Sequence, residues 1–167
     1  MGLSLNLSAQ TVDESLAKMQ ELVDKNQLEK VEDYYDEHED SLSKNWMALE
    51  KLAISLERRE KYKEALEIYR KIILNFHRAE HSKILSAKPK TVVDPSYYEH
   101  NKLPYYYYKL SYASAQLFLL TSGYTPVSER KKLKANFDGF VTLARKVKVD
   151  EADLKLLEQI LKEKIEK

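Results

Sequence analysis

Apolar residues recur at intervals of three and four along most of the chain, which is the spacing of one face of an α-helix. The first such stretch covers residues 11–25. Its apolar positions are Val12, Leu16, Met19, Leu22 and Val23. Thr11 precedes the stretch and Glu14 follows three residues later, a combination that forms a capping box at helix starts. The pattern therefore predicts a helix that begins after Thr11.

Three further helices are predicted after short breaks. The second covers about residues 28–40, and Ser43 is expected to cap a third helix that carries Trp46 and Leu56 on its apolar face. The fourth begins near Tyr62 and ends near residue 78. Helices joined by such short turns pack antiparallel. We therefore predict two helical hairpins, at about residues 11–40 and 43–78.

The apolar positions of the two hairpins repeat at a displacement of 34 residues. The repeated pairs are Leu22 and Leu56, Leu28 and Tyr62, Val31 and Ala65, and Tyr35 and Tyr69. Residues 49–74, LEKLAISLERREKYKEALEIYRKIIL, closely resemble one tetratricopeptide repeat, a helical hairpin of that length. The resemblance is good over residues 43–76 and weak over 11–40. It implies an all-α fold in which antiparallel hairpins stack as a superhelix.

The remainder of the chain is predicted to complete this stack. Residues 79–103 contain two prolines and little periodicity, which indicates a long inserted loop. A third hairpin is expected at about residues 104–148, and Asp150 is expected to cap a last helix over residues 150–167. Residues 1–167 would then form a single domain of about seven helices, with the last one as a C-terminal capping helix.

Composition supports a helical, water-exposed chain. Charged residues make up 33% of the sequence, and there are only 3 glycines and 4 prolines to interrupt helices. The absence of cysteine excludes disulfides, thiolate nucleophiles and cysteine metal sites. Residues 1–10 lack the positive charge of a secretory leader, and no stretch is apolar enough for a membrane span. We expect a cytoplasmic protein with no membrane partner.

The charges are distributed unevenly. Acidic side chains outnumber basic ones by 14 to 7 in residues 1–60, whereas basic side chains lead by 21 to 13 in residues 61–167. Solvated helix faces explain both excesses, and docking patches are the alternative. The basic clusters at residues 130–134 and 145–148 leave RNA binding open, although the net charge of +1 argues against it. Head-to-tail assembly of copies into a homo-oligomer also stays open.

Residues arranged for catalysis are few. His77 to His81 match the H-x-x-E-H pattern of a zinc peptidase, but the pentapeptide continues a predicted repeat helix and no third ligand is evident. No phosphate-binding loop, dinucleotide fingerprint or nucleophile elbow occurs. We predict that the protein is not an enzyme and that it has no catalytic residue, metal site or cofactor.

Tyrosine is concentrated in one part of the chain, since 8 of the 12 lie between Tyr97 and Tyr124. Helical spacing places Tyr105, Tyr108 and Tyr112 on one side of their helix, and Tyr106 and Tyr107 elsewhere. Partly exposed tyrosines suit recognition, because they offer apolar area and a hydroxyl at low entropic cost. The alternative is that the inserted loop covers these rings.

The resemblance to tetratricopeptide repeats implies a function. In that family the first helices of successive hairpins line a groove that binds an extended peptide or a helix. Transferred to this chain, the resemblance predicts a non-catalytic adaptor or scaffold that binds a protein partner. The residues predicted to bind the partner are Met47, Lys51, Ile54, Arg58, Tyr105, Tyr108 and Tyr112. Glu50 is expected beside them.

Overall fold

The computed structural model describes the backbone of residues 11–86 and 102–165, and the side chains of residues 11–76 and 102–165. Eight helices and no strand lie within this described part, which confirms the all-α prediction. The helices are α1 (Val12–Asp24), α2 (Leu28–Glu37), α3 (Glu39–Leu42), α4 (Trp46–Arg58), α5 (Tyr62–Ser86), α7 (Leu103–Leu119), α8 (Val127–Lys146) and α9 (Glu151–Ile165).

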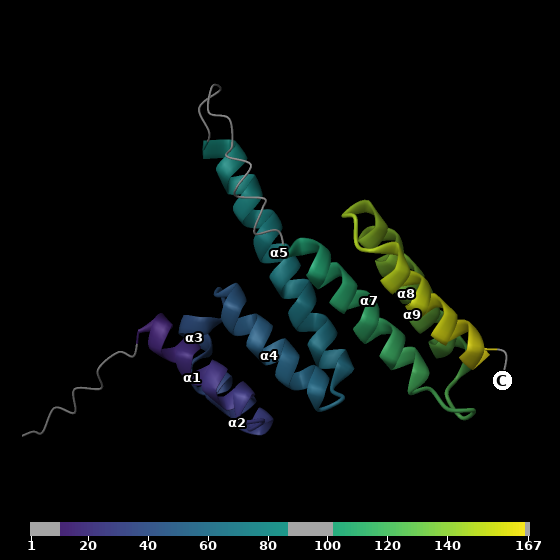
Figure 1. The fold of residues 1–167 in the computed structure, drawn as a ribbon, viewed down its shortest axis with the longest axis horizontal. Coiled ribbons are helices and arrows are strands. Elements are labelled where there is room, and N and C mark those ends of the chain that lie inside the picture. Colours follow the sequence, from purple (N-terminus) through teal and green to yellow (C-terminus); the bar gives the residue numbers. More distant parts are fainter. Residues whose placement is uncertain (1–10, 87–101, 166–167) are drawn as a thin grey trace, which may run out of the picture.

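The helices pack in the order of the chain. Helices α1 and α2 contact α4, α4 packs along α5, α5 along α7, and α7 along α8, while α9 lies against α7. Figure 1 shows α1, α4 and α7 running in the same direction, with α5 between α4 and α7 in this view, the acid-rich α1–α3 at one end and α8–α9 at the other. In this arrangement α4 lies between α1 and α7, and we call the side of α4 that is not packed on α2 or α5 its open side.

The N-terminal caps of α1 and α4 can be compared with the caps that the sequence predicts. Thr11 forms the predicted capping box: its backbone N–H donates to Glu14 Oε2 at 3.0 Å, and its hydroxyl accepts the Glu14 N–H at 3.2 Å. The predicted cap of the next hairpin is wrong, because Ser43 ends α3. Asn45 caps α4 instead, and its side-chain oxygen accepts the backbone N–H groups of Met47 and Ala48.

The turns within the first two hairpins have the same backbone geometry. Asn26 and Glu60, which are 34 positions apart, both have positive φ angles, of 54° and 60°. In each turn the next residue's N–H closes back onto a leucine carbonyl, Leu22 or Leu56, at 2.9 Å. A single residue in the left-handed conformation at the end of an α-helix lets the following N–H groups bond to carbonyls that would otherwise lack partners. Helix α8 ends in the same way at Lys148, with a φ of 62° and the Val149 N–H donating to the Ala144 carbonyl at 3.1 Å, so this turn occurs at the 34-residue displacement and also outside it.

The core follows the predicted apolar stripes. Leu22 and Leu56 are buried, as are Val31 and Ala65, and Tyr35 and Tyr69. The cluster continues without interruption through α7, α8 and α9. Its fully buried aromatic and aliphatic members there include Tyr106, Phe137, Val141, Leu154 and Leu161.

Two boundaries differ from the sequence prediction. The predicted second helix is divided at His38, whose ring stacks on Tyr34 with the centroids 4.3 Å apart, and a separate short helix follows. Helix α5 continues to Ser86, so the inserted loop does not begin at residue 79, and the His77–His81 pattern lies on this helix with side chains outside the described residues. Residues 87–101 of the predicted loop also lie outside them.

None of the described helices is long and apolar enough to cross a bilayer.

Candidate functional site on helices α1, α4 and α7

The open side of α4 carries four of the seven predicted binding residues. Met47, Lys51, Ile54 and Arg58 are separated by four, three and four positions, which places them on one face of the helix. Met47 is 38% exposed and Ile54 is half-buried against the core. The prediction that these residues share a surface is consistent with this arrangement, and we call it the α4 face.

The two cations of the α4 face are bound to α1. Lys51 donates to the side chain of Gln20, and an Arg58 guanidinium N–H reaches the backbone carbonyl of Val23 at 3.4 Å. Burial lowers the pKa of Lys51, and the nearby Glu50 carboxylate opposes this shift. These cations therefore join α4 to α1 in addition to presenting charge, and Arg58 is the more exposed of the two.

The opposite edge of α4 is joined to α7 by two ion pairs. Glu50 accepts from Lys102 at 3.0 Å, and Glu57 accepts from Lys109 at 2.5 Å. Glu57 and Lys109 are both largely buried, so their pairing is less screened than that of surface ions. The two glutamates lie two helical turns apart, and so do the two lysines. The ion pairs therefore hold α7 parallel to α4.

Glu57 also connects the site to the core. The hydroxyl of the fully buried Tyr69 of α5 donates to Glu57 Oε2 at 2.8 Å. Burial, together with the Glu57 charge, raises the pKa of Tyr69. The carboxylate thus receives hydrogen bonds from α5 and α7 while sitting on α4, and we call this group of three residues the Glu57 network.

The tyrosine run divides between core and surface as its spacing predicts. Tyr106 and Tyr107 are buried, whereas Tyr105 is 38% exposed and Tyr108 and Tyr112 are half-buried. Tyr106 packs against Phe76 and Tyr69 of α5. Part of this run is therefore exposed among the described residues, and the alternative that the inserted loop covers these rings falls on residues outside them.

Tyr105 and Tyr112 flank the ammonium group of Lys109. The Lys109 nitrogen lies 5.8 Å from the centre of the Tyr105 ring and 5.4 Å from that of Tyr112. Burial, followed by the charges of Glu50 and Glu57, raises the pKa of Tyr105 to about 12, so its hydroxyl stays protonated at neutral pH. The two rings therefore enclose the Lys109 ammonium on α7 next to the ion pairs with α4.

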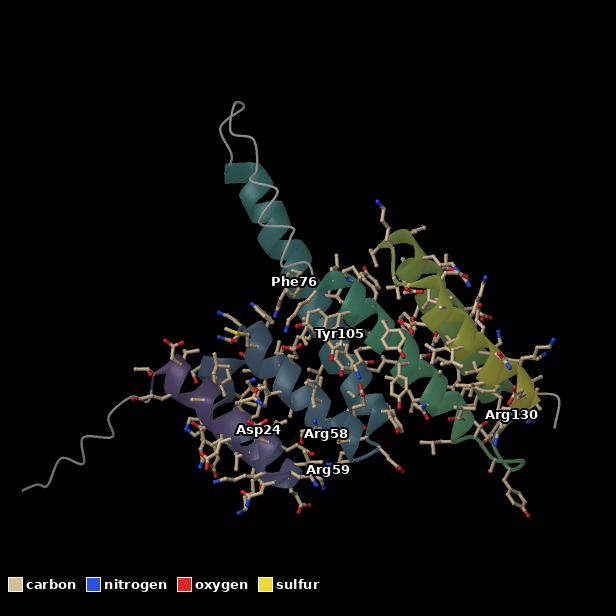
Figure 2. All side chains as sticks on the ribbon, viewed as in Figure 1. Asp24, Arg58, Arg59, Phe76, Tyr105 and Arg130 are labelled. Atoms are coloured by element: carbon tan, nitrogen blue, oxygen red, sulfur yellow. The ribbon has the colours of Figure 1, made fainter. Side chains whose placement is uncertain are left out.

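The structure adds three residues that the sequence prediction missed, namely Glu57, Lys102 and Lys109. The available signal was their spacing: Glu50 and Glu57 lie two turns apart, as do Lys102 and Lys109. Figure 2 places Tyr105 between α4 and α7, and Arg58 at the far end of α4. The predicted residues therefore lie along two helices, α4 and α7, and do not converge on a point.

Chemically, this surface is suited to binding. Its exposed groups are mixed: Met47, Arg58 and Tyr105 are exposed on α4 and α7, while α1 contributes the polar Gln20 and the acidic Asp24 beside Lys51. Among the described residues of this surface, no nucleophile lies beside a general base. Within the described residues, no group of three or more His, Asp or Glu side chains is placed to hold a metal ion. Comparisons with protein-family models, curated proteins and solved structures give no match to this chain.

Proposed function

We propose that this protein is a non-catalytic interaction module that binds a peptide or helix of a partner protein on the surface formed by α1, α4 and α7. The observation that carries the proposal is the α4 face: Met47 and Ile54 are its apolar members with Lys51 between them, and Arg58 follows one turn later. Tyr105 of α7 adds a partly exposed ring near the ion pairs between the two helices. Apolar anchors beside aromatic and arginine side chains are the usual composition of binding hot spots.

The repeated geometry of the first two hairpins supports the resemblance to tetratricopeptide repeats. The positive-φ turn residues Asn26 and Glu60 recur at the displacement of 34 that the apolar positions also follow. In such repeats the first helix of each hairpin lines the binding surface, a role that falls here to α1, α4 and α7. The resemblance adds weight to the proposal, but the binding surface has to be tested directly.

The chemistry of the surface defines the partner. An amphipathic segment would place apolar side chains over Met47 and Ile54, in the manner of a helix that lies in a groove. A carboxylate of the partner would reach Arg58, whose only hydrogen bond within the described residues is the long one to the Val23 carbonyl. We therefore expect an amphipathic peptide with an acidic residue near one end of its apolar stripe.

Site-specific photocrosslinking in the source cells tests this proposal. A photoreactive amino acid replaces Met47, and in a matched control it replaces Leu143 of α8, which is exposed to nearly the same extent, 40% against 38%. We expect a defined adduct with a segment of another protein from position 47 alone. A synthetic copy of that segment should bind the parent and lose affinity on Ile54→Glu, with helix content unchanged by circular dichroism.

Three results would contradict the proposal. Equal adducts from positions 47 and 143 would indicate non-specific contact. Adducts that disappear after nuclease treatment would indicate RNA, for which the exposed basic residues of α8 are the candidate surface. Adducts with a second copy of the chain alone would indicate self-assembly.

A further inference from the structure

A cavity of about 610 Å³ opens at the end of the molecule farthest from α1. It lies where the last turn of α7, the connection to α8, the first turns of α8 and the C-terminal turn of α9 meet. Ligand sites for small organic molecules commonly have volumes of about 300–1,000 Å³. The cavity is separate from the α4 face, and we call it the α7–α9 pocket.

Cations dominate the charged lining of this pocket. Arg130, Lys131 and Lys134 enter it from α8 and Lys164 from α9, and no described lining residue is acidic. Lys134 is paired with Asp138 at 2.6 Å, and both residues also line a second cavity between α8 and α9. The other three have no ion pair within the described residues. Three unpaired cations around one concavity create a positive potential that attracts an anion.

The same pocket has an apolar side. Phe118 of α7 is buried at its wall, while Val127 and Ile165 stand exposed at its rim, at 58% and 55%. The second cavity, of about 310 Å³ between α8 and α9, shares Lys134 and Ile165 with the first. Its lining is largely charged, since Asp138, Glu158 and Lys162 join Lys134 beside the buried Phe137 and Leu161. The apolar surface open to a ligand is therefore that of the first cavity.

We propose that the α7–α9 pocket binds one molecule of a single-chain amphiphile with an anionic head group. The head group is held by Arg130, Lys131 and Lys164, and the apolar tail lies between the exposed Val127 and Ile165 against the Phe118 wall. An isolated inorganic anion would leave the apolar wall uncovered. A nucleic acid would require exposed stacking rings, whereas the pocket's one aromatic side chain among the described residues, Phe118, is buried. The proposal is independent of the α4 face.

Calorimetric titration of the full chain with decanoate, kept below its micelle concentration, tests this inference. We expect saturable binding of one molecule, and affinity should rise by about fourfold for each methylene added from hexanoate to decanoate, since burying a methylene group contributes about 0.8 kcal/mol. Decyltrimethylammonium, with the same tail and the opposite charge, should not bind in the pocket, and inorganic phosphate should bind far more weakly.

A matched pair of variants locates the site. Arg130→Gln/Lys131→Gln removes two pocket cations, whereas Lys132→Gln/Lys146→Gln removes two exposed cations from the same helix outside the pocket. We expect the first variant to bind decanoate about tenfold more weakly and the second to match the parent. Equal weakening in both would show a general charge effect. That result, an affinity independent of tail length, or binding to anionic vesicles without binding of monomeric decanoate would overturn the proposal.

Discussion

Replacing Glu57 should destabilise the fold more than any surface charge on the same helices, because the Glu57 network joins three helices. Glu57 lies in the last turn of α4, where the helix dipole disfavours an anion. Its side chain is only 15% exposed and receives hydrogen bonds from Tyr69 at 2.8 Å and from Lys109 at 2.5 Å. The unfavourable helix position is thus offset by contacts outside the helix.

The magnitude follows from the groups that Glu57→Ala leaves behind. The hydroxyl of the fully buried Tyr69 loses its partner, at a cost of about 1–3 kcal/mol. The ammonium of Lys109 loses its carboxylate but retains some access to water, which limits this contribution to about 1 kcal/mol. We expect a loss of about 2–4 kcal/mol in unfolding free energy. Glu57→Gln keeps an acceptor for Tyr69, so its cost should be smaller, about 1 kcal/mol.

Urea denaturation followed by far-ultraviolet circular dichroism measures these differences. The control is Glu67→Ala, which removes the exposed Glu67–Arg70 pair of α5 and should cost no more than about 0.5 kcal/mol. Combining Glu57→Ala with Tyr69→Phe should cost less than the sum of the single changes by about 1 kcal/mol. If Glu57→Ala unfolds at the same urea concentration as Glu67→Ala, the Glu57 network does not stabilise the packing of α4, α5 and α7.

Three further outcomes are expected. Asn45→Ala should lower the unfolding free energy by about 1 kcal/mol through loss of the α4 cap, whereas Ser43→Ala should change it little. Denaturant titrations of both variants measure this difference. Glu60→Gly should raise the unfolding free energy by up to about 1 kcal/mol because glycine adopts positive φ without strain. Glu67→Gly, inside α5, should lower it by about 1 kcal/mol relative to Glu67→Ala, and thermal unfolding of these variants checks both signs. Burial raises the folded-state pKa of Tyr69 above its ordinary value of 10.0. The contribution of protonated Tyr69 to the unfolding free energy is therefore complete below pH 10 and is lost as the pH rises further. In a spectrophotometric alkaline titration we expect this tyrosine to ionise only as the chain unfolds, and Tyr69→Phe should reduce the amplitude of that late step.

Local chemistry predicted most of the first two hairpins. The Thr11 capping box and the apolar stripes specify where α1, α2, α4 and α5 lie in the sequence, since capping and amphipathic spacing act within one or two turns. The Asn45 cap was missed because Ser43 is an equally good capping residue by type. The choice between them depends on Leu42, which the short α3 buries, and that burial is a tertiary effect.

The contacts between hairpins required the structure. Glu57 and Lys109 are 52 positions apart, with residues 87–101 between them, so no periodicity links them. Helical spacing correctly separated Tyr105 from Tyr106, but it could not show that Tyr106 packs on Phe76 and that Tyr105 lies beside Lys109. Long-range pairing depends on how helices are stacked, and the sequence pattern of each helix is compatible with several stackings.

Helix α7 is the element on which both proposals depend, and it separates them. Its first turns carry Tyr105 and the ion pairs to α4, while Phe118, near its end, forms the wall of the α7–α9 pocket. Over three helical turns lie between Tyr105 and Phe118, so a local substitution at one site leaves the side chains of the other in place. Ile54→Glu should therefore abolish peptide binding without changing decanoate affinity, and Arg130→Gln/Lys131→Gln should do the reverse. Loss of both activities in either variant would instead indicate that the packing of α7 itself had changed.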